Sequence, residues 1–166
     1  MHEFGTLTGT KAEHYTLLLE QLDALLTGEA DWLANLANTA ALLYEQLGEI
    51  NWAGFYLRRG DELVLGPFGG KPACTRIRWG KGVCGTAAQR RESLVVPDVG
   101  QFPGHIACDS ASRSEIVVPL LAGAEVAGVL DIDSPHLARF DATDRQYLEA
   151  AAAVLGRHID FATLRR

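Results

Sequence analysis

The spacing of apolar residues changes from helical to alternating near Ile50, and this change limits the folds that the chain can adopt. Before it, apolar side chains recur every three or four residues over 12–26 and over 29–47, which predicts two helices. After it, the segments NWAGFYL and ELVLGPF alternate around the polar connection RRGD, which predicts a β-hairpin. Gly28 and Gly48 follow the two helical stretches, where glycine commonly ends a helix.

The rest of the chain continues this plan of strands and covering helices. A glycine-rich turn leads into a short Ala-rich helix over 80–92, and SLVVPDV predicts a short strand. The segments SEIVVPLLAG and AEVAGVLDIDS predict a second hairpin, and residues 140–161 predict a long helix with Asp141 as its N-cap. We therefore expect an α+β fold, in which a central antiparallel β-sheet is flanked by N-terminal helices and a long C-terminal helix.

Composition indicates one domain and narrows its partners. The 166 residues, 48% of them hydrophobic, are enough for one core, so we expect a single domain over 1–166 with its core at about 15–161. A net charge of -6 with scattered basic residues argues against a nucleic-acid partner. Apolar runs long enough to cross a membrane are missing, and MHEFGTLTG lacks the pattern of a secretion signal. We therefore expect a cytoplasmic protein that binds no membrane.

Cys108 stands out among the three cysteines because it lies in a loop. The segment GHIACDSASRSEIVVPL places it among small polar residues, whereas a structural thiol would lie inside the apolar run that follows. The loop over 100–112 is long and rich in Gly, Pro and Ser, which is typical of functional loops. The nearby cation Arg113 favours a thiolate. Cys108 is therefore a candidate nucleophile, and an unreactive exposed cysteine is the alternative interpretation.

Five segments together resemble the GAF-domain free methionine-(R)-sulfoxide reductases, and the resemblance runs from about Tyr15 to the C-terminal helix. They are NWAGFYL, LVLGPFGGKPAC, GKGVCGTAAQ, VPDVGQFPGHIACDSASRSEIVVPL and GVLDIDSP. The resemblance implies a GAF fold and the thiol-dependent reduction of free L-methionine-(R)-sulfoxide to L-methionine, without a cofactor. It also implies that Cys108 becomes a sulfenic acid, and that an intramolecular disulfide is then recycled by thioredoxin as electron donor.

A second thiol must resolve the sulfenic acid, and two cysteines compete for this role. Cys74 follows GGKPA, a loop that can move, while Cys84 lies between Gly82 and Gly85 at the start of a helix. Because the resolving sulfur has to travel to form a disulfide, we favour Cys74 as the first resolver. Cys84 is the alternative or a second relay, and a small core residue is its other interpretation.

The acidic and aromatic candidates follow from strand spacing. Asp131 and Asp133 are two apart in a predicted strand and share a face, and Glu115 begins the neighbouring strand. Three carboxylates on one patch repel, which raises the pKa of at least one and keeps a proton or a cation-binding charge available. In the family that the chain resembles, these three positions bind and activate the substrate; a solvated strand edge is the other interpretation. Trp52 matches the substrate-wall residue, and Tyr56 shares its face, where core packing is the alternative role.

The remaining features leave several alternatives open. We expect backbone N–H groups of the Ser110–Ser114 loop to bind the substrate carboxylate. His2, His14, His105, His136 and His158 show no ligand spacing, so we predict no metal site, and His105 is a reserve acid. A sensing GAF module and a redox sensor are the competing functions, although 166 residues leave no room for an effector domain. The N-terminal helices suit a homodimer or the cover of their own sheet.

Overall fold

Six strands form one sheet in the computed structural model, which describes residues 9–106 and 108–165. The strands are β1 Trp52–Arg59, β2 Glu62–Gly70, β3 Arg76–Arg78, β4 Leu94–Val96, β5 Ser114–Ala122 and β6 Glu125–Ser134. Their order is β3-β2-β1-β6-β5-β4, and every neighbouring pair is antiparallel. The predicted α+β class with a central antiparallel sheet is confirmed.

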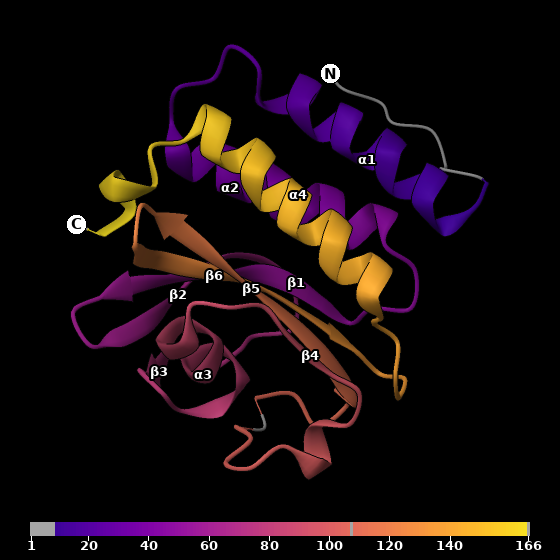
Figure 1. The fold of residues 1–166 in the computed structure, drawn as a ribbon, viewed down its shortest axis with the longest axis vertical. Helices are drawn as coiled ribbons and strands as arrows, with labels where there is room; N and C mark the ends of the chain where they lie inside the picture. Colours follow the sequence, from indigo (N-terminus) through magenta and orange to yellow (C-terminus); the bar gives the residue numbers. More distant parts are fainter. Residues whose placement is uncertain (1–8, 107, 166) are drawn as a thin grey trace.

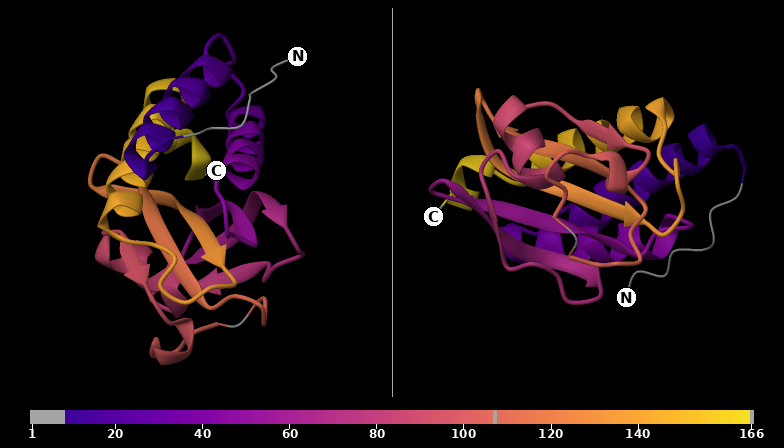
Figure 2. Two further views of the ribbon diagram at one scale, coloured as in Figure 1. Left: turned by 90° about the vertical axis from the view of Figure 1, so that its right-hand side faces the viewer. Right: turned by 90° about the horizontal axis from the view of Figure 1, so that it is seen from below.

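Helices cover both faces of this sheet, which gives the three layers seen in Figures 1 and 2. The helices α1 Lys11–Leu26, α2 Trp32–Gln46 and α4 Ala142–His158 lie on one face. The other face carries α3 Gly82–Arg90 and the 3-10 helix η1 Val99–Gln101. Within the described part of the chain, no helix has the length and apolar character that a bilayer span needs. The predicted domain start at residue 1 lies outside the described residues.

Alternate side chains of the central strands enter two different cores, because successive residues of a strand point to opposite faces. Phe55 and Leu130 join the larger core beneath α1, α2 and α4. Tyr56 and Val129 join a smaller core beneath α3. Both cores are apolar, so the central strands carry long buried runs instead of the half-polar pattern of a one-sided sheet.

The second helix begins and ends differently from the prediction. The Asp31 side chain accepts a hydrogen bond from the Ala34 amide, so α2 begins at Trp32, three residues after the predicted start. The C-cap is Leu47 instead of the predicted Gly48, and the positive φ of 59° that follows the helix belongs to Glu49. Leu33 belongs to the apolar pattern that predicts the helix, yet it is 52% exposed.

The helix α4 has a well-defined start. The Asp141 side chain accepts from the Asp144 amide, and the Asp144 side chain accepts from the Asp141 amide, which forms a capping box. The helix ends at His158, and the predicted continuation to 161 is a separate 3-10 helix, η2, over Phe161–Arg165. The expectation that Asp141 is the N-cap is confirmed.

Asp144 also ties α4 to the N-terminal helix. Its fully buried carboxylate accepts from the Tyr15 hydroxyl at 2.6 Å, from Lys11 Nζ at 2.5 Å and from an Arg139 guanidinium nitrogen at 3.3 Å. Burial, followed by the hydrogen bond to Asp144, raises the pKa of Tyr15 far above its ordinary value. Tyr15 also stacks on Tyr147 of α4, with ring centroids 5.2 Å apart.

We predict that Asp144→Ala lowers the free energy of unfolding by about 3–5 kcal/mol, because it leaves the buried partners of a charged group without their hydrogen-bond acceptor. The Tyr15 hydroxyl and the Arg139 guanidinium would both lose an acceptor inside the protein. Urea denaturation followed by circular dichroism measures the change. Glu149→Ala on the exposed face of the same helix is the control, and it should change stability by less than about 0.5 kcal/mol. An equal effect of both variants would contradict the structural role of Asp144.

Candidate active site

The three acidic candidates meet on the face of the sheet that α3 covers. Asp133 lies opposite Trp52 on one side and opposite Glu115 on the other. Trp52, Asp133 and Glu115 therefore form one row across β1, β6 and β5. Asp131 occupies the next row of the same face and lies opposite Gly54. The two-residue spacing and the strand register therefore place all three carboxyl groups together beneath α3.

Burial changes the ionisation of these groups. Glu115 is 7% exposed and Asp131 is 5% exposed, which excludes the interpretation as a solvated strand edge. Burial raises the pKa of each carboxyl group, and repulsion from Asp131 raises the pKa values of Glu115 and Asp133 further. Hydrogen bonds with the side chains of Glu115 and Cys84 oppose the rise at Asp131. Burial therefore favours the protonated form of all three groups, and the two hydrogen bonds at Asp131 favour its charged form.

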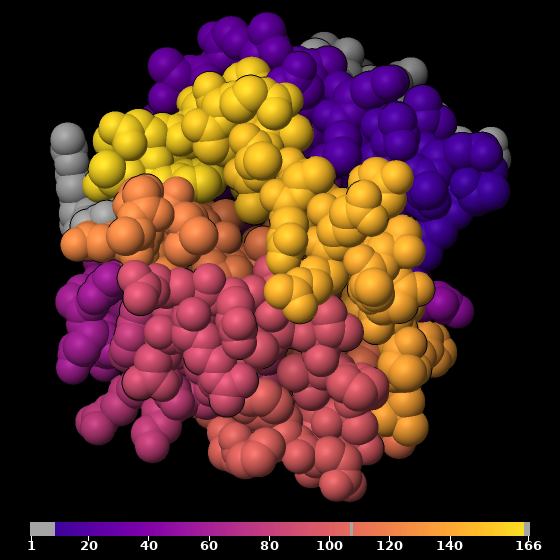
Figure 3. Space-filling model, in the orientation of Figure 1, coloured from indigo at the N-terminus to yellow at the C-terminus, as the bar shows by residue number. Residues whose placement is uncertain are grey.

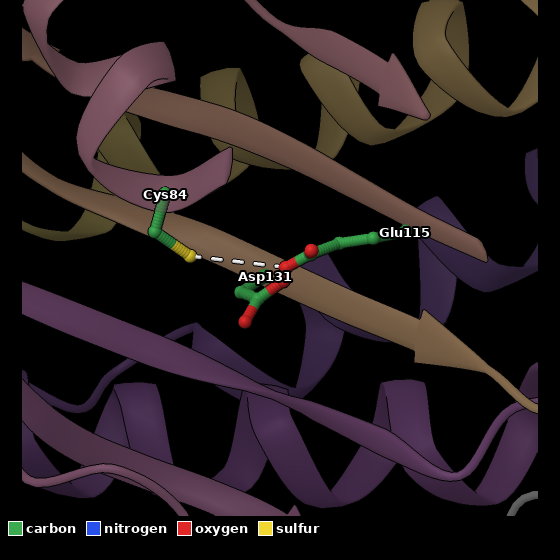
Figure 4. Close-up of side chains that lie close together, drawn as sticks. All are labelled: Cys84, Glu115 and Asp131. Atoms are coloured by element: carbon green, nitrogen blue, oxygen red, sulfur yellow. Dashed lines mark hydrogen bonds between the residues drawn. The ribbon is translucent and has the colours of Figure 1, made fainter. Parts of the chain in front are cut away.

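The three thiols occupy two kinds of environment. Cys74 and Cys108 form a disulfide with their Cα atoms 5.4 Å apart, and both residues are half-buried. Cys84, near the start of α3, is 3% exposed, and its sulfur lies 4.0 Å from Glu115 Oε2. Figure 4 shows Cys84 pointing from α3 toward Asp131 and Glu115 on the sheet. Burial, followed by the nearby carboxyl groups, raises the pKa of Cys84 well above its ordinary value.

The two aromatic candidates hold the loop that carries Cys74. Trp52 and Tyr56 stack with ring centroids 5.9 Å apart. The Trp52 indole N–H donates to the Lys71 carbonyl at 3.1 Å, and the Tyr56 hydroxyl donates to the Cys74 carbonyl at 2.8 Å. Both side chains belong to the smaller core, so packing and a place in the cavity wall are combined in the same residues.

The loop that carries Cys108 is tied to the sheet through Asn51, a residue that sequence reasoning missed. The side-chain NH2 group of Asn51 donates to the Asp109 carboxylate at 3.0 Å and to the Ser112 hydroxyl at 3.1 Å. The backbone N–H of Asn51 donates to the Asp133 carbonyl. The only sequence signal is a polar amide placed directly before the apolar strand that contains Trp52.

The amides of the same loop are largely occupied. The Ala111 amide donates to the Asp109 side chain, and the Ser112 amide donates to the Asp109 carbonyl. The Arg113 amide donates to the Ser134 carbonyl. The Ser110–Ser114 loop therefore offers fewer N–H groups to a ligand than the sequence suggested.

A cavity of about 40 Å³ connects these groups. Its lining includes Trp52, Tyr56, Cys84, Cys108, Glu115, Asp131 and Asp133, together with Gly82, Val83 and His105. Burial lowers the pKa of His105, which favours its neutral form. Residues 97–106 and 108–113, drawn in salmon in Figure 3, lie at the margin of the molecule away from α1. With the disulfide formed, the space is far below the roughly 300 Å³ or more of typical ligand pockets.

Known proteins share both the sequence and the fold. A model of the GAF domain matches residues 22–159. Over 145 residues the chain is 55% identical to the free methionine-R-sulfoxide reductase of Escherichia coli, covering 87% of this chain and 88% of that protein. Over 159 residues it is 44% identical to the free methionine-R-sulfoxide reductase of Saccharomyces cerevisiae, covering 91% and 88%.

A solved structure extends the similarity to three dimensions. The free methionine-R-sulfoxide reductase of Neisseria meningitidis, in complex with its substrate, superimposes with a TM-score of 0.93 at 49% identity, covering 98% of both chains. Similarity at this level spans every element that builds the cavity. The chain therefore belongs to the GAF-domain family of free methionine-R-sulfoxide reductases.

Proposed function

We propose that this chain reduces free L-methionine-(R)-sulfoxide to L-methionine, with Cys108 as the nucleophile. The observation that carries the proposal is the meeting of a cysteine pair and three carboxyl groups, two of them buried, at one cavity. Sulfoxide reduction needs a nucleophilic sulfur, a proton donor for the oxygen and a second thiol. The names of the relatives at 44–55% identity support the same substrate.

The reaction balances with these groups. The Cys108 thiolate attacks the sulfoxide sulfur and a protonated carboxyl group gives its proton to the oxygen, which leaves a transient bond between the two sulfurs. The hydroxyl group then moves to the Cys108 sulfur while the S–O bond of the substrate and the S–S bond break. Methionine leaves, and Cys108 carries the oxygen as a sulfenic acid. Cys74 then attacks the Cys108 sulfur, the hydroxyl leaves as water, and a disulfide forms. A dithiol of the thioredoxin type supplies the two electrons and two protons that restore both thiols.

The environments of the two remaining cysteines support Cys74 as the resolving thiol. Cys74 is joined to Cys108 and is half-buried, so a reducing protein can reach the disulfide. Cys84 is buried on a helix that Gly85 holds close to the Arg78 carbonyl, where a Cβ would lie only 2.4 Å away. Moving the Cys84 sulfur to Cys108 would disturb this packing. Cys84 is therefore assigned to the cavity wall and not to resolution of the sulfenic acid.

The carboxyl groups divide the work by their ionisation. The raised pKa values of Glu115 and Asp133 favour their protonated forms, which suits the donor for the sulfoxide oxygen. At Asp131, hydrogen bonds with Glu115 and Cys84 favour the charged form, and its Oδ1 has no hydrogen-bond partner among the described residues. A substrate ammonium would satisfy this oxygen. Asp131 is therefore assigned to binding and its neighbours to proton transfer.

The substrate carboxylate fits the start of α3. The N-cap residue Lys81 makes no side-chain capping hydrogen bond, and Gly82 and Val83 line the cavity. The first amides of a helix have no partner within the helix, and they carry the positive end of its dipole. A carboxylate bound there lies across the cavity floor from the ammonium at Asp131, and the methyl-sulfur end faces Trp52 and Tyr56.

The disulfide-closed cavity of about 40 Å³ has no room for a methionine sulfoxide. Reduction must therefore precede substrate entry, because it releases the loop of Cys74 from the loop of Cys108. The proposed cycle thus orders electron donation before binding.

The proposed homodimer and the cytoplasmic location stay predictions. Helix α1 packs on α4, and α2 packs on β1 and β2, so both helices cover their own chain. Light scattering of the purified protein measures the mass in solution and decides between monomer and dimer.

Cysteine variants test the assigned roles. Cys108→Ser should reduce methionine formation from the free R-sulfoxide to background with dithiothreitol, since a hydroxyl is not the required nucleophile. Cys74→Ser should release about one methionine per protein and then stall with thioredoxin, whereas Cys84→Ser should continue to turn over. Chromatography of free methionine follows all three. A stall confined to Cys84→Ser would reverse the two resolving assignments.

The buried acid Glu115 couples activity to stability. Glu115→Gln should lower single-turnover methionine formation by about 10²–10⁴-fold, the usual contribution of a general acid. The pKa of Glu115 is raised in the folded state, so its contribution to stability is complete below about pH 4.3 and is lost as pH rises toward the folded pKa. The variant should therefore gain stability over the parent as pH increases from 5 to 8.

Urea denaturation at several pH values measures this gain. Glu20→Gln, on the exposed surface of α1, is the matched control and should leave the pH dependence unchanged. A Glu115→Gln variant that keeps parental activity would show that another group supplies the proton, with Asp133 the next candidate and His105 the one after it.

Asn51 is assigned as a positioning residue for the Cys108 loop. Asn51→Ala removes hydrogen bonds to Asp109 and Ser112 that are worth about 1 kcal/mol each, so kcat/KM should fall by roughly 30-fold. Ser112→Ala should produce part of this loss, and combining the two changes should add less than the sum of the single effects. Full additivity would show that Asn51 does not act through Ser112. Gln101→Ala, exposed on η1, is the control.

A further inference from the structure

We propose that Cys84, Glu115 and Asp131 form a binding site for one divalent transition-metal ion of the zinc type. The three residues come from α3, β5 and β6, and one ligand atom of each lies within 4.8 Å of the other two. Figure 4 shows the thiol sulfur and the carboxyl oxygens directed at one another. All three residues are buried, so the group differs from the exposed acidic clusters that are common on protein surfaces.

The spacing suits a tetrahedral ion. With zinc–sulfur and zinc–oxygen lengths of about 2.3 and 2.0 Å, a sulfur and an oxygen ligand lie roughly 3.5 Å apart. The Cys84 sulfur and Glu115 Oε2 are 4.0 Å apart, so a small rotation of either side chain brings them to ligand separation.

A second observation points to a cationic ligand. Asp131 is only 5% exposed, yet its Oδ1 has no hydrogen-bond partner among the described residues. A buried acceptor left without a donor costs about 1–3 kcal/mol. Asp131 lines the cavity, so this oxygen is available to an ion that enters there.

The donor set selects the class of ion. Mg²⁺ and Ca²⁺ require six or more oxygen ligands, which this site does not provide. One thiolate with two carboxylates suits a borderline ion such as Zn²⁺, which accepts sulfur and oxygen in a four-coordinate site. The fourth position opens to the cavity, where Asp133 or water completes it. The thiol loses its proton on coordination.

Occupation of this site has a consequence that rests on the proposed function. The ion uses the oxygen of Asp131 that we assign to the substrate ammonium, and it replaces the proton of Glu115. Metal and free methionine sulfoxide therefore exclude one another. The binding itself is independent of that assignment.

The probe is Co²⁺, followed by displacement with Zn²⁺, on the full chain carrying Cys74→Ser and Cys108→Ser. Since the chain has three cysteines, Cys84 is then the single thiol. We expect one equivalent of Co²⁺ to bind with a sulfur-to-cobalt charge-transfer absorption, which Zn²⁺ removes. Adding Cys84→Ser should abolish that absorption. Adding Asp131→Asn should weaken Co²⁺ binding by more than about tenfold, because changing even a residue that only contacts a metal ligand typically costs that much affinity.

A fallback protein is available for this metal-binding test. If the double variant fails to fold by circular dichroism, the oxidised parental protein is used, because its disulfide leaves only Cys84 free. Absence of the sulfur-to-cobalt absorption in folded protein overturns the site, and equal binding after Cys84→Ser does the same.

Free methionine-(R)-sulfoxide is then added to the Co²⁺-loaded double variant. Displacement of the ion supports a shared location, and undiminished binding overturns the overlap while leaving the metal site in place. Methionine formation by the parental protein is assayed separately. An active enzyme without a metal site contradicts this inference alone, and an inactive protein with the site contradicts the proposed function alone.

Discussion

The crowding of three carboxyl groups, two buried and one half-buried, on one face of the central sheet is the constraint on which the site depends. Charged carboxylates in that position would repel one another and would lose their hydration. The raised pKa values of Glu115 and Asp133 favour the protonated form, which reduces this cost and is the form that the proposed proton donation needs. Helix α3 and the two cysteine loops exclude water from the carboxyl groups, so these covering elements determine the chemistry as much as the acids themselves.

The two faces of the sheet divide stability from chemistry. The larger core beneath α1, α2 and α4 is strongly apolar, and its one buried charged centre, Asp144, has partners on every side that the structure describes. Beneath α3, at the smaller core, lie the buried Asp131 carboxyl group, whose Oδ1 has no partner among the described residues, and the Cys84 thiol next to Glu115. A stable half therefore supports a half in which unfavourable burial is tolerated, as expected where function and stability conflict.

Three residues of the same type serve different purposes because their surroundings differ. Cys74 and Cys108 lie on loops that aromatic and amide side chains hold against the cavity, and both are half-buried. Cys84 lies inside the fold with a raised pKa beside two acids, which makes it a poor nucleophile and a suitable soft ligand. Exposure and neighbouring charge, rather than the thiol itself, separate these roles.

Local patterns were enough to predict the α+β class, the hairpins, the Asp141 N-cap and the common face of Asp131 and Asp133, because these features arise from periodicity and spacing within one segment. Three other features became visible in the folded chain alone: Cys84 meets Glu115 and Asp131, Asn51 anchors the Cys108 loop, and Glu49 instead of Gly48 takes the positive φ. The contacts of Cys84 and Asn51 join residues that are tens of positions apart in the chain. Strand order and the placement of α3 bring them together, and local patterns carry no information about either.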